Sequence, residues 1–180
     1  MDEKRFVRVS KLLSFGLRHR PDKLGLHLDE AGWAGVEQVL ESLAAQGEKV
    51  SIEELERLVS TSDKQRFALS DDGRRIRANQ GHSIAVDLGL VAREPPQRLY
   101  HGTVERYLES IRAEGLLRGS RTHVHLSIDE STARVVAGRR KGVPVILGVR
   151  AGEMHADGFS FFLSANGVWL TAHVPARYLD

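Results

Sequence analysis

Apolar residues recur at helical spacing in three segments of the first sixty residues, and this repetition limits the possible fold more than any other feature. In residues 4–17, 36–46 and 52–59 the apolar side chains lie three and four positions apart, which places them on one face of a helix. Ser51 and Glu54 add a capping box at the start of the third segment. The pattern therefore predicts three amphipathic helices, each with one face turned toward a core.

The three predicted helices are followed by the pattern of a β-hairpin. Residues 67–69 and 76–78 are expected to be strands, because Asp72-Gly73 between them is typical of a tight turn. Alternating leucines in residues 24–28 predict one more short strand. Three helices and a basic hairpin are typical of a winged helix, which often binds nucleic acid. The same fold also serves protein contacts, so the pattern alone identifies no ligand.

The second half of the chain predicts a substantial β component. Strands are expected in five segments: residues 99–101, 124–126, 143–149, 159–163 and 168–172. Ser127 and Glu130 predict a capping box for a helix that ends before Gly138, and an earlier helix is expected to end at Gly115. The chain as a whole is therefore expected to be an α+β protein.

Two adjacent prolines, Pro95-Pro96, mark the expected boundary between two lobes. They stiffen the chain and exclude regular structure at that point. A chain of 180 residues is long enough to form two small lobes, each with a core. We therefore divide it into residues 1–94 and 95–180.

Composition excludes several classes of protein. The chain has no cysteine, which rules out disulfides, thiolate zinc sites and a cysteine nucleophile. It opens with no signal peptide, and no apolar run approaches about 18 residues, so we expect a soluble cytoplasmic protein without membrane contact. A formal net charge of +2 also argues against a polycation that coats nucleic acid.

The type and placement of the cations are more informative than the net charge. Arginine provides 20 of the 26 basic residues, and its planar donor fork matches a phosphate group. A GC-rich genome would raise the arginine count equally well. The cations gather in residues 64–77 and 112–141, which suggests one anionic site fed from two parts of the chain, or two such sites.

Two groups of polar residues in the first half could bind phosphate. Arg18 and His19 end the first predicted helix, where they either compensate the helix dipole or form a phosphate clamp beside a proton-transfer group. Residues 64–67 are expected on the first hairpin strand, and Lys64 and Arg66 lie two apart, so both should point to one face of it. That face is either a solvated basic surface or part of an anion site.

Three further segments of the second half carry candidate residues. The residues concerned are His101-Gly102-Thr103, the polar set Arg121, His123, His125 and Ser127, and the basic run from Gly138 to Gly142 that includes Arg139. Four polar groups on one strand face are hard to bury without partners. A zinc site at His123 and His125 would lack further ligands with familiar spacing, so no metal is expected. The basic run either binds a pyrophosphate or is a solvated helix end, and it is not a P-loop.

Taken together, these segments resemble the RNA 2′-phosphotransferase family, known for tRNA 2′-phosphotransferases. The segments that carry the resemblance are residues 12–19 (LLSFGLRH), 64–67 (KQRF), 76–83 (IRANQGHS), 100–103 (YHGT) and 121–127 (RTHVHLS). They occur in order and span nearly the whole chain, which makes the set specific although each segment alone is weak.

The resemblance implies a fold and a set of site residues. The family joins an N-terminal winged-helix RNA lobe to a C-terminal ADP-ribosyltransferase-like lobe with a split β-sheet, which binds NAD⁺. Its catalytic Arg-His-Arg-Arg set corresponds to Arg18, His19, Arg66 and Arg121, with Lys64 as an additional phosphate ligand. The implied NAD⁺ contacts are His101, Gly102, Thr103, His125, Ser127 and Arg139.

The resemblance also implies a reaction. NAD⁺ is consumed as a co-substrate: the RNA 2′-phosphate displaces nicotinamide to give RNA-2′-phospho-ADP-ribose. The products are then 2′-hydroxyl RNA and ADP-ribose 1″,2″-cyclic phosphate. In residues 166–171 an apolar residue stands where protein-modifying ADP-ribosyltransferases have a glutamate. An anionic phosphate nucleophile needs no carboxylate base and would be repelled by one.

The expected protein is a monomer that acts on tRNA-like RNA, as in tRNA splicing, without an obligatory protein partner or a metal. One alternative is a transferase that ADP-ribosylates nucleic-acid phosphate ends or protein side chains, and the first of these could be a side activity. Another is a winged-helix regulator without catalysis, which would leave the histidines of the second half unexplained. Stabilisation by NAD⁺ would distinguish the enzymes from the regulator.

Overall fold

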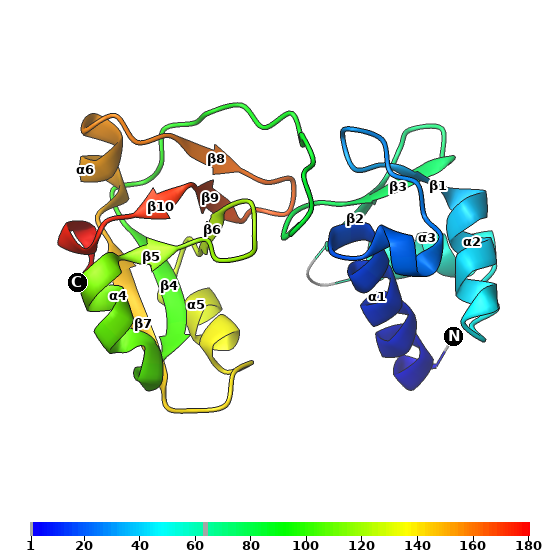
Figure 1. The fold of residues 1–180 in the computed structure, drawn as a ribbon, viewed down its shortest axis with the longest axis horizontal. Coiled ribbons are helices and arrows are strands. Elements are labelled where there is room, and N and C mark those ends of the chain that lie inside the picture. Colours follow the sequence, from blue (N-terminus) through cyan, green and yellow to red (C-terminus); the bar gives the residue numbers. More distant parts are fainter. Residues whose placement is uncertain (1, 63–64) are drawn as a thin grey trace. The chain divides into compact units, whose positions relative to one another are not determined.

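The computed structural model describes residues 2–62 and 65–180, and the chain forms two compact units (Figure 1). The first unit comprises residues 1–89 and the second residues 90–180. The division lies a few residues before the boundary expected at Pro95-Pro96. Residues 92 and 93 already belong to the second unit, because Ala92 forms a β-bridge with Phe162 and the Arg93 N–H donates to the carbonyl of Phe161 at 2.8 Å.

The described part of the first unit consists of helices and one antiparallel sheet. Its elements are α1 (Glu3–Arg18), the 3-10 helix η1 (Pro21–Leu24), β1 (Ala34–Gly35), α2 (Val36–Ala45), α3 (Ile52–Thr61), β2 (Phe67–Leu69) and β3 (Arg75–Ala78). The three predicted helices, the capping box at Ser51 and Glu54, and the hairpin are confirmed. The sheet has the order β1-β3-β2, and its strand β1 was not expected.

The strand expected in residues 24–28 was wrong. Pro21 starts a 3-10 turn instead, and Gly25 follows in the left-handed region at φ 61°. The Leu26 N–H then donates to the carbonyl of Pro21 at 2.9 Å, and the Leu26 side chain is buried in the core. The alternating leucines thus reflect burial in a turn rather than sheet pairing.

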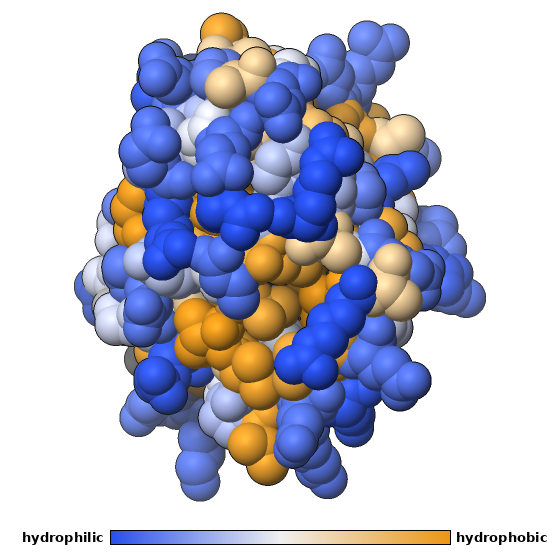
Figure 2. Space-filling view, turned by 90° about the vertical axis from the view of Figure 1, so that its left-hand side faces the viewer, coloured by the Kyte–Doolittle hydropathy of each residue, from blue (hydrophilic) through white to orange (hydrophobic). Residues whose placement is uncertain are grey.

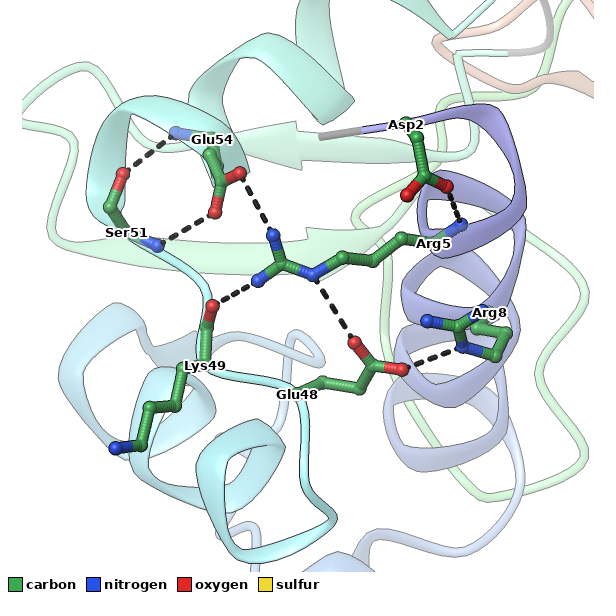
Figure 3. A network of polar contacts seen from close by, with 7 residues as sticks. All are labelled: Asp2, Arg5, Arg8, Glu48, Lys49, Ser51 and Glu54. Atoms are coloured by element: carbon green, nitrogen blue, oxygen red, sulfur yellow. Dashed lines mark hydrogen bonds and ion pairs between the residues drawn. The ribbon is translucent and has the colours of Figure 1, made fainter.

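One face of α1 joins the core of the first unit and another face carries ion pairs. Val9, Leu13 and Leu17 are buried against residues of α2, α3 and the sheet. On the other face, Arg5 and Arg8 reach Glu48, and Arg5 also reaches Glu54 (Figure 3). The Glu54 carboxylate also accepts from the Ser51 N–H as part of the capping box, so these contacts tie α1 to the start of α3.

The second unit is built mainly from short antiparallel strands. Its elements are β4 (Leu99–Val104), η2 (Glu105–Tyr107), α4 (Leu108–Glu114), β5 (Leu116–Leu117), β6 (Val124–Leu126), α5 (Glu130–Ala137), β7 (Pro144–Val149), α6 (Ala151–Ala156), β8 (Phe161–Leu163), β9 (Trp169–Thr171), β10 (His173–Val174) and η3 (Ala176–Tyr178). The sheets are β4-β7, β6-β9-β8 and β10-β5. All five predicted strands are present in the second unit, and the α+β class is confirmed.

Some details of the second unit differ from the sequence-based expectation. Helix α5 is capped by Asp129, whose side chain accepts from the Thr132 N–H at 2.7 Å, so the capping box at Ser127 was wrong. Ser127 is used elsewhere: its N–H donates to the carbonyl of Tyr100 at 2.7 Å, and the Tyr100 N–H donates back at 2.9 Å. This bridge joins β4 to the end of β6. Strands β5 and β10 and helix α6 were not expected.

Within the described residues, no helix is long and apolar enough to cross a membrane. A cavity of about 330 Å³ in the second unit is lined by α4, β7 and the C-terminal residues. Figure 2 views this unit and shows apolar side chains gathered in a patch framed by hydrophilic ones. None of the candidate site residues lines this cavity.

Gly102 allows β4 and α5 to approach closely. A Cβ atom at this position would lie 2.0 Å from the carbonyl oxygen of Ala133, a backbone atom that cannot turn aside. The neighbouring Ala133 and Ala137 are fully buried on the facing side of α5. The glycine is therefore needed for packing, whatever ligand its backbone meets.

We expect Gly102→Ala to lower the free energy of unfolding by about 2 kcal/mol or more, because the new methyl overlaps helix backbone. The matched control is Gly148→Ala on the paired strand β7, where a Cβ would lie at an ordinary 3.5 Å from Asp180. Thermal unfolding should show a loss of several degrees for the first variant and little change for the second. Equal midpoints for the two variants would contradict the packing argument.

Candidate functional site

Three of the four residues in the implied catalytic set lie together in the first unit. Arg18 is the last residue of α1, and its Nη2 donates to the carbonyl of Arg66 at 3.3 Å. The Arg18 guanidinium also lies 5.8 Å from the centroid of the Phe67 ring. Arg66 in turn directs Nη1 to the Ser10 hydroxyl at 3.4 Å. The end of α1 and the start of the hairpin thus bring two guanidinium groups and the His19 imidazole into one region.

His19 is oriented by a serine that sequence reasoning did not assign. Its Nδ1 lies 2.9 Å from the Ser83 hydroxyl, and the Ser83 N–H donates to the carbonyl of Arg18 at 2.9 Å. Ser83 therefore satisfies a free carbonyl at the end of α1 and positions the adjacent imidazole at the same time. Its place in segment 76–83 was the available signal, but a contact 64 residues apart cannot be read from spacing.

The position of Arg66 depends on an unusual backbone turn. The strand expected to carry Lys64 and Arg66 begins only at Phe67, so Arg66 precedes it, and Lys64 lies outside the described residues. Gln65 has a positive φ of 36°, which is uncommon for a residue with a side chain. The Asn79 side-chain amide donates to the Gln65 carbonyl at 2.6 Å, and the Asn79 N–H donates to the Arg66 carbonyl at 2.9 Å. Asn79 therefore holds the turn that presents Arg66.

Buried polar atoms without hydrogen-bond partners concentrate in residues 77–82, at the end of β3 and just after it. Within the described residues, they include Arg77 Nε, Asn79 Oδ1, Gln80 Oε1 and both ring nitrogens of His82. Such atoms are rare in folded proteins, since each costs free energy unless a ligand or ordered water satisfies it. Their concentration within six residues favours a ligand site over chance.

His82 is the most deeply buried of these residues and has no exposed surface. Burial first, and then the positive charges of Arg18, His19 and Arg77, lower the pKa of His82 to about 4. The imidazole is therefore neutral at pH 7 and adds no positive charge to that of Arg18 and Arg77.

A second set of candidate residues lies in the second unit. The Nδ1 of His101 contacts the carbonyl of His125 at 3.1 Å, so this nitrogen carries the proton and donates. Arg121 Nη1 lies 2.9 Å from His125 Nδ1, which must then accept, because a guanidinium only donates. Burial, followed by the charges of Arg140 and Arg121, lowers the pKa of His101. His101, His125 and Arg121 thus form one hydrogen-bonded chain with a neutral His101.

Arginines around this chain are close enough to affect one another. Partial burial of its guanidinium and the charges of Arg140 and Arg139 lower the pKa of Arg121. The charged groups that lower the pKa of Arg121 are these two arginines. Uncompensated positive charge of this kind attracts phosphate groups.

Of the four polar residues expected on one strand face, only His125 lies within a strand, although Arg121 still contacts it. Strand β6 covers only Val124–Leu126, so Arg121 and His123 precede it in a bend. The His123 ring meets Phe162 edge-on with ring centroids 5.6 Å apart. Among the residues described, no group of three or more histidine, aspartate or glutamate side chains could hold a metal ion.

The remaining predicted contact residues differ in exposure. Thr103 is buried, and Gly102 faces the backbone of α5, whereas Arg139 is exposed at the end of α5. Ser127 is half-buried beside Tyr100. Any contribution of Gly102 to ligand binding would therefore be made by its backbone.

Comparison with known proteins gives one consistent result. A model described as "RNA 2′-phosphotransferase, Tpt1 / KptA family" matches residues 4–173. A protein of Flavobacterium johnsoniae named "Probable RNA 2′-phosphotransferase" is 51% identical over 180 residues, which cover 100% of this chain and 98% of that protein. Proteins of the same name from Streptomyces coelicolor and Burkholderia lata are each 55% identical, over 99% and 96% of this chain and 97% and 89% of their own lengths.

The buried neutral His82 predicts that the first unit loses stability in acid. Its pKa is about 4 in the folded protein and about 6.5 when unfolded, so the unfolded chain binds more protons between these values. Stability should therefore fall as pH drops from about 6.5 to 4, by roughly 3 kcal/mol at most.

The measurement is hydrogen exchange of the α1 core amides across this pH range. His82→Gln should flatten the pH dependence, whereas His27→Gln, at an exposed position of the same unit, should leave it unchanged. An unchanged slope in His82→Gln would contradict the assignment.

Proposed function

Because this chain belongs to the RNA 2′-phosphotransferase family, we propose that it removes an internal 2′-phosphate from RNA by transferring it to NAD⁺. The products are RNA with a 2′-hydroxyl, nicotinamide and ADP-ribose 1″,2″-cyclic phosphate. The observation that carries the proposal is the grouping of Arg18, His19 and Arg66 by the end of α1 and the turn before β2. Two guanidinium groups can hold a phosphate, and an imidazole beside them can transfer a proton when the bond between the phosphorus and the RNA 2′-oxygen breaks.

The fold supports a division of labour between the two units. Three helices and the antiparallel sheet β1-β3-β2 are consistent with a winged-helix lobe that binds RNA. The separate sheets β4-β7 and β6-β9-β8 are consistent with the split sheet of an ADP-ribosyltransferase-like lobe that binds NAD⁺. Strand β9 consists of the buried residues Trp169, Leu170 and Thr171 and carries no glutamate of the kind that protein-modifying transferases use.

The residues of the second unit fit a dinucleotide. Arg121, Arg139 and Arg140 form a cationic group that suits a diphosphate. Neutral His101 donates from Nδ1 to a backbone carbonyl, so its Nε2 is an acceptor that suits a ribose hydroxyl. His101, Thr103, His125, Ser127 and Arg139 are the proposed NAD⁺ contacts, together with the backbone of Gly102.

In the first step, the RNA 2′-phosphate attacks the anomeric carbon of the nicotinamide ribose, and nicotinamide leaves. The leaving group is cationic in NAD⁺, so the protein mainly positions the reactants. Arg18 and Arg66 hold the phosphate, with Lys64 as a third ligand. The result is RNA-2′-phospho-ADP-ribose.

In the second step, the neighbouring ribose hydroxyl attacks the same phosphorus, and the RNA 2′-oxygen leaves. Negative charge on the equatorial oxygens is stabilised by Arg66 and Arg121. His19, oriented by Ser83, exchanges the proton between the entering hydroxyl and the departing oxygen. Neither step requires a metal ion.

We propose tRNA-like RNA with an internal 2′-phosphate as the substrate, and a cytoplasmic monomer as the active form. ADP-ribosylation of nucleic-acid phosphate ends would use the same groups and is proposed as a side activity. The direct test is incubation of a short RNA bearing one internal 2′-phosphate with and without NAD⁺, in the absence of added metal. NAD⁺-dependent release of nicotinamide and formation of 2′-hydroxyl RNA are expected. Conversion without NAD⁺, or none at all, would overturn the proposal.

The two-step scheme predicts that Arg66→Ala or Arg121→Ala slows the second step more than the first. Charge on phosphorus-bound oxygens develops mainly in the second step, so loss of one guanidinium should cost on the order of 10²–10³-fold there. Gel separation of the RNA species over time should then show RNA-2′-phospho-ADP-ribose accumulating. The control Arg150→Ala removes an arginine of the second unit that pairs with Glu153 and Asp180. Slow turnover without any accumulated intermediate would contradict this division.

A further inference from the structure

A groove beside α1 lies next to the candidate phosphate ligands but contains residues that the reaction does not use. It has a volume of about 200 Å³. Its lining residues come from α1 and from the turn before β2: Phe6, Val7, Ser10, Lys11, Ser14 and Arg66. The groove therefore combines two cations, two hydroxyl groups and an apolar end. Arg66 is the one residue that it shares with the proposed catalytic set.

The lining residues of α1 form a continuous stripe that leads to Arg18. Val7, Lys11, Ser14 and Arg18 are spaced by four, three and four residues, which places them along one face of the helix. At 1.5 Å per residue, Lys11 lies about 10 Å from Arg18 along the helix axis. An extended ligand anchored at Arg18 and Arg66 could therefore reach Lys11 without bending.

The cations of α1 differ in their surroundings. Arg5 and Arg8 are neutralised by Glu48 and Glu54 on another face of the helix (Figure 3). The described residues that line the groove include Lys11 and Arg66, which brings a second cation beside Arg66. Two cations that line the same groove favour an anionic ligand.

The other lining groups narrow the chemistry of that ligand. Serine hydroxyls and a lysine ammonium donate to phosphate oxygens, which is the usual way that proteins contact a nucleic-acid backbone. Val7 is 44% exposed, and with the half-buried Phe6 it offers an apolar surface at the far end. A sugar or base can pack on such a surface.

We propose that this groove binds the RNA phosphodiester next to the 2′-phosphate, with Lys11 as its cation and Ser14 as a further donor. The inference rests on the proposed function, because the neighbouring phosphodiester can reach Lys11 only if Arg18 and Arg66 hold the 2′-phosphate. It goes beyond that function by assigning a backbone subsite that no catalytic step requires. A ligand with two phosphates spaced along a chain is a polynucleotide rather than a free nucleotide.

The test measures binding of two ligands without NAD⁺: a hexanucleotide RNA with one internal 2′-phosphate, and a nucleoside 2′-monophosphate that has no phosphodiester. Lys11→Ala should weaken hexanucleotide binding about three- to tenfold and leave mononucleotide binding unchanged. The slope of log affinity against log salt concentration should fall by about 0.7, the value for one contact to a single strand. Lys11→Arg should retain most of the affinity.

Lys23→Ala is the matched control, because Lys23 is an exposed lysine of the same unit outside the groove. It should change neither affinity nor salt slope. Equal weakening of both ligands by Lys11→Ala would place Lys11 at the 2′-phosphate itself and overturn the subsite. Unchanged hexanucleotide binding by Lys11→Ala, with normal NAD⁺-dependent conversion by the wild type, would overturn the proposed subsite but leave the proposed function intact. Failure of the wild type to bind or convert the hexanucleotide would overturn the proposed function and the inference together.

Discussion

The end of α1 is hydrogen-bonded to the turn before β2 and to the loop after β3, and the arrangement of the first unit's candidate residues depends on this junction. Ser83 donates to the Arg18 carbonyl through its N–H and contacts His19 through its hydroxyl. Arg18 itself donates to the Arg66 carbonyl. Because α1 is anchored in the core by buried Val9 and Leu13, these contacts hold the side chains against a rigid support rather than a mobile loop.

The same junction accumulates positive charge and buried polar atoms that nothing in the described part of the unit satisfies. Arg77, Gln80 and His82 each contribute atoms of this kind. A ligand can remove such a cost: a phosphate oxygen would accept from Arg77 Nε, whereas Gln80 Oε1 needs a donor such as a ribose hydroxyl. A neutral His82 adds no positive charge beside Arg18, His19 and Arg77, so its burial serves electrostatics as well as packing.

The second unit solves a different physical problem, which is to hold two histidines and a set of arginines on short strands. Each strand of β6-β9-β8 has only three residues, too few to be stable alone. The bridge between Tyr100 and Ser127 connects this sheet to β4, and the missing side chain of Gly102 lets α5 cover the other side of β4. The contact from His101 to the His125 carbonyl crosses the same junction, so the candidate ligand contacts lie where the two sheets meet.

By itself the sequence determined the elements that depend on neighbouring residues. The three amphipathic helices, the capping box at Ser51, the hairpin turn at Asp72-Gly73 and the longer strands all follow from local periodicity and caps, so they could be predicted. The resemblance of five segments also predicted which arginines and histidines to examine. Tertiary structure alone decided the short strands β1, β5 and β10, because two-residue strands exist only through a partner distant in the chain. It also decided that Ser83 meets His19, that Asn79 holds the turn before Arg66, and that Lys11 faces a groove, since these contacts depend on how the chain folds back on itself rather than on spacing along it.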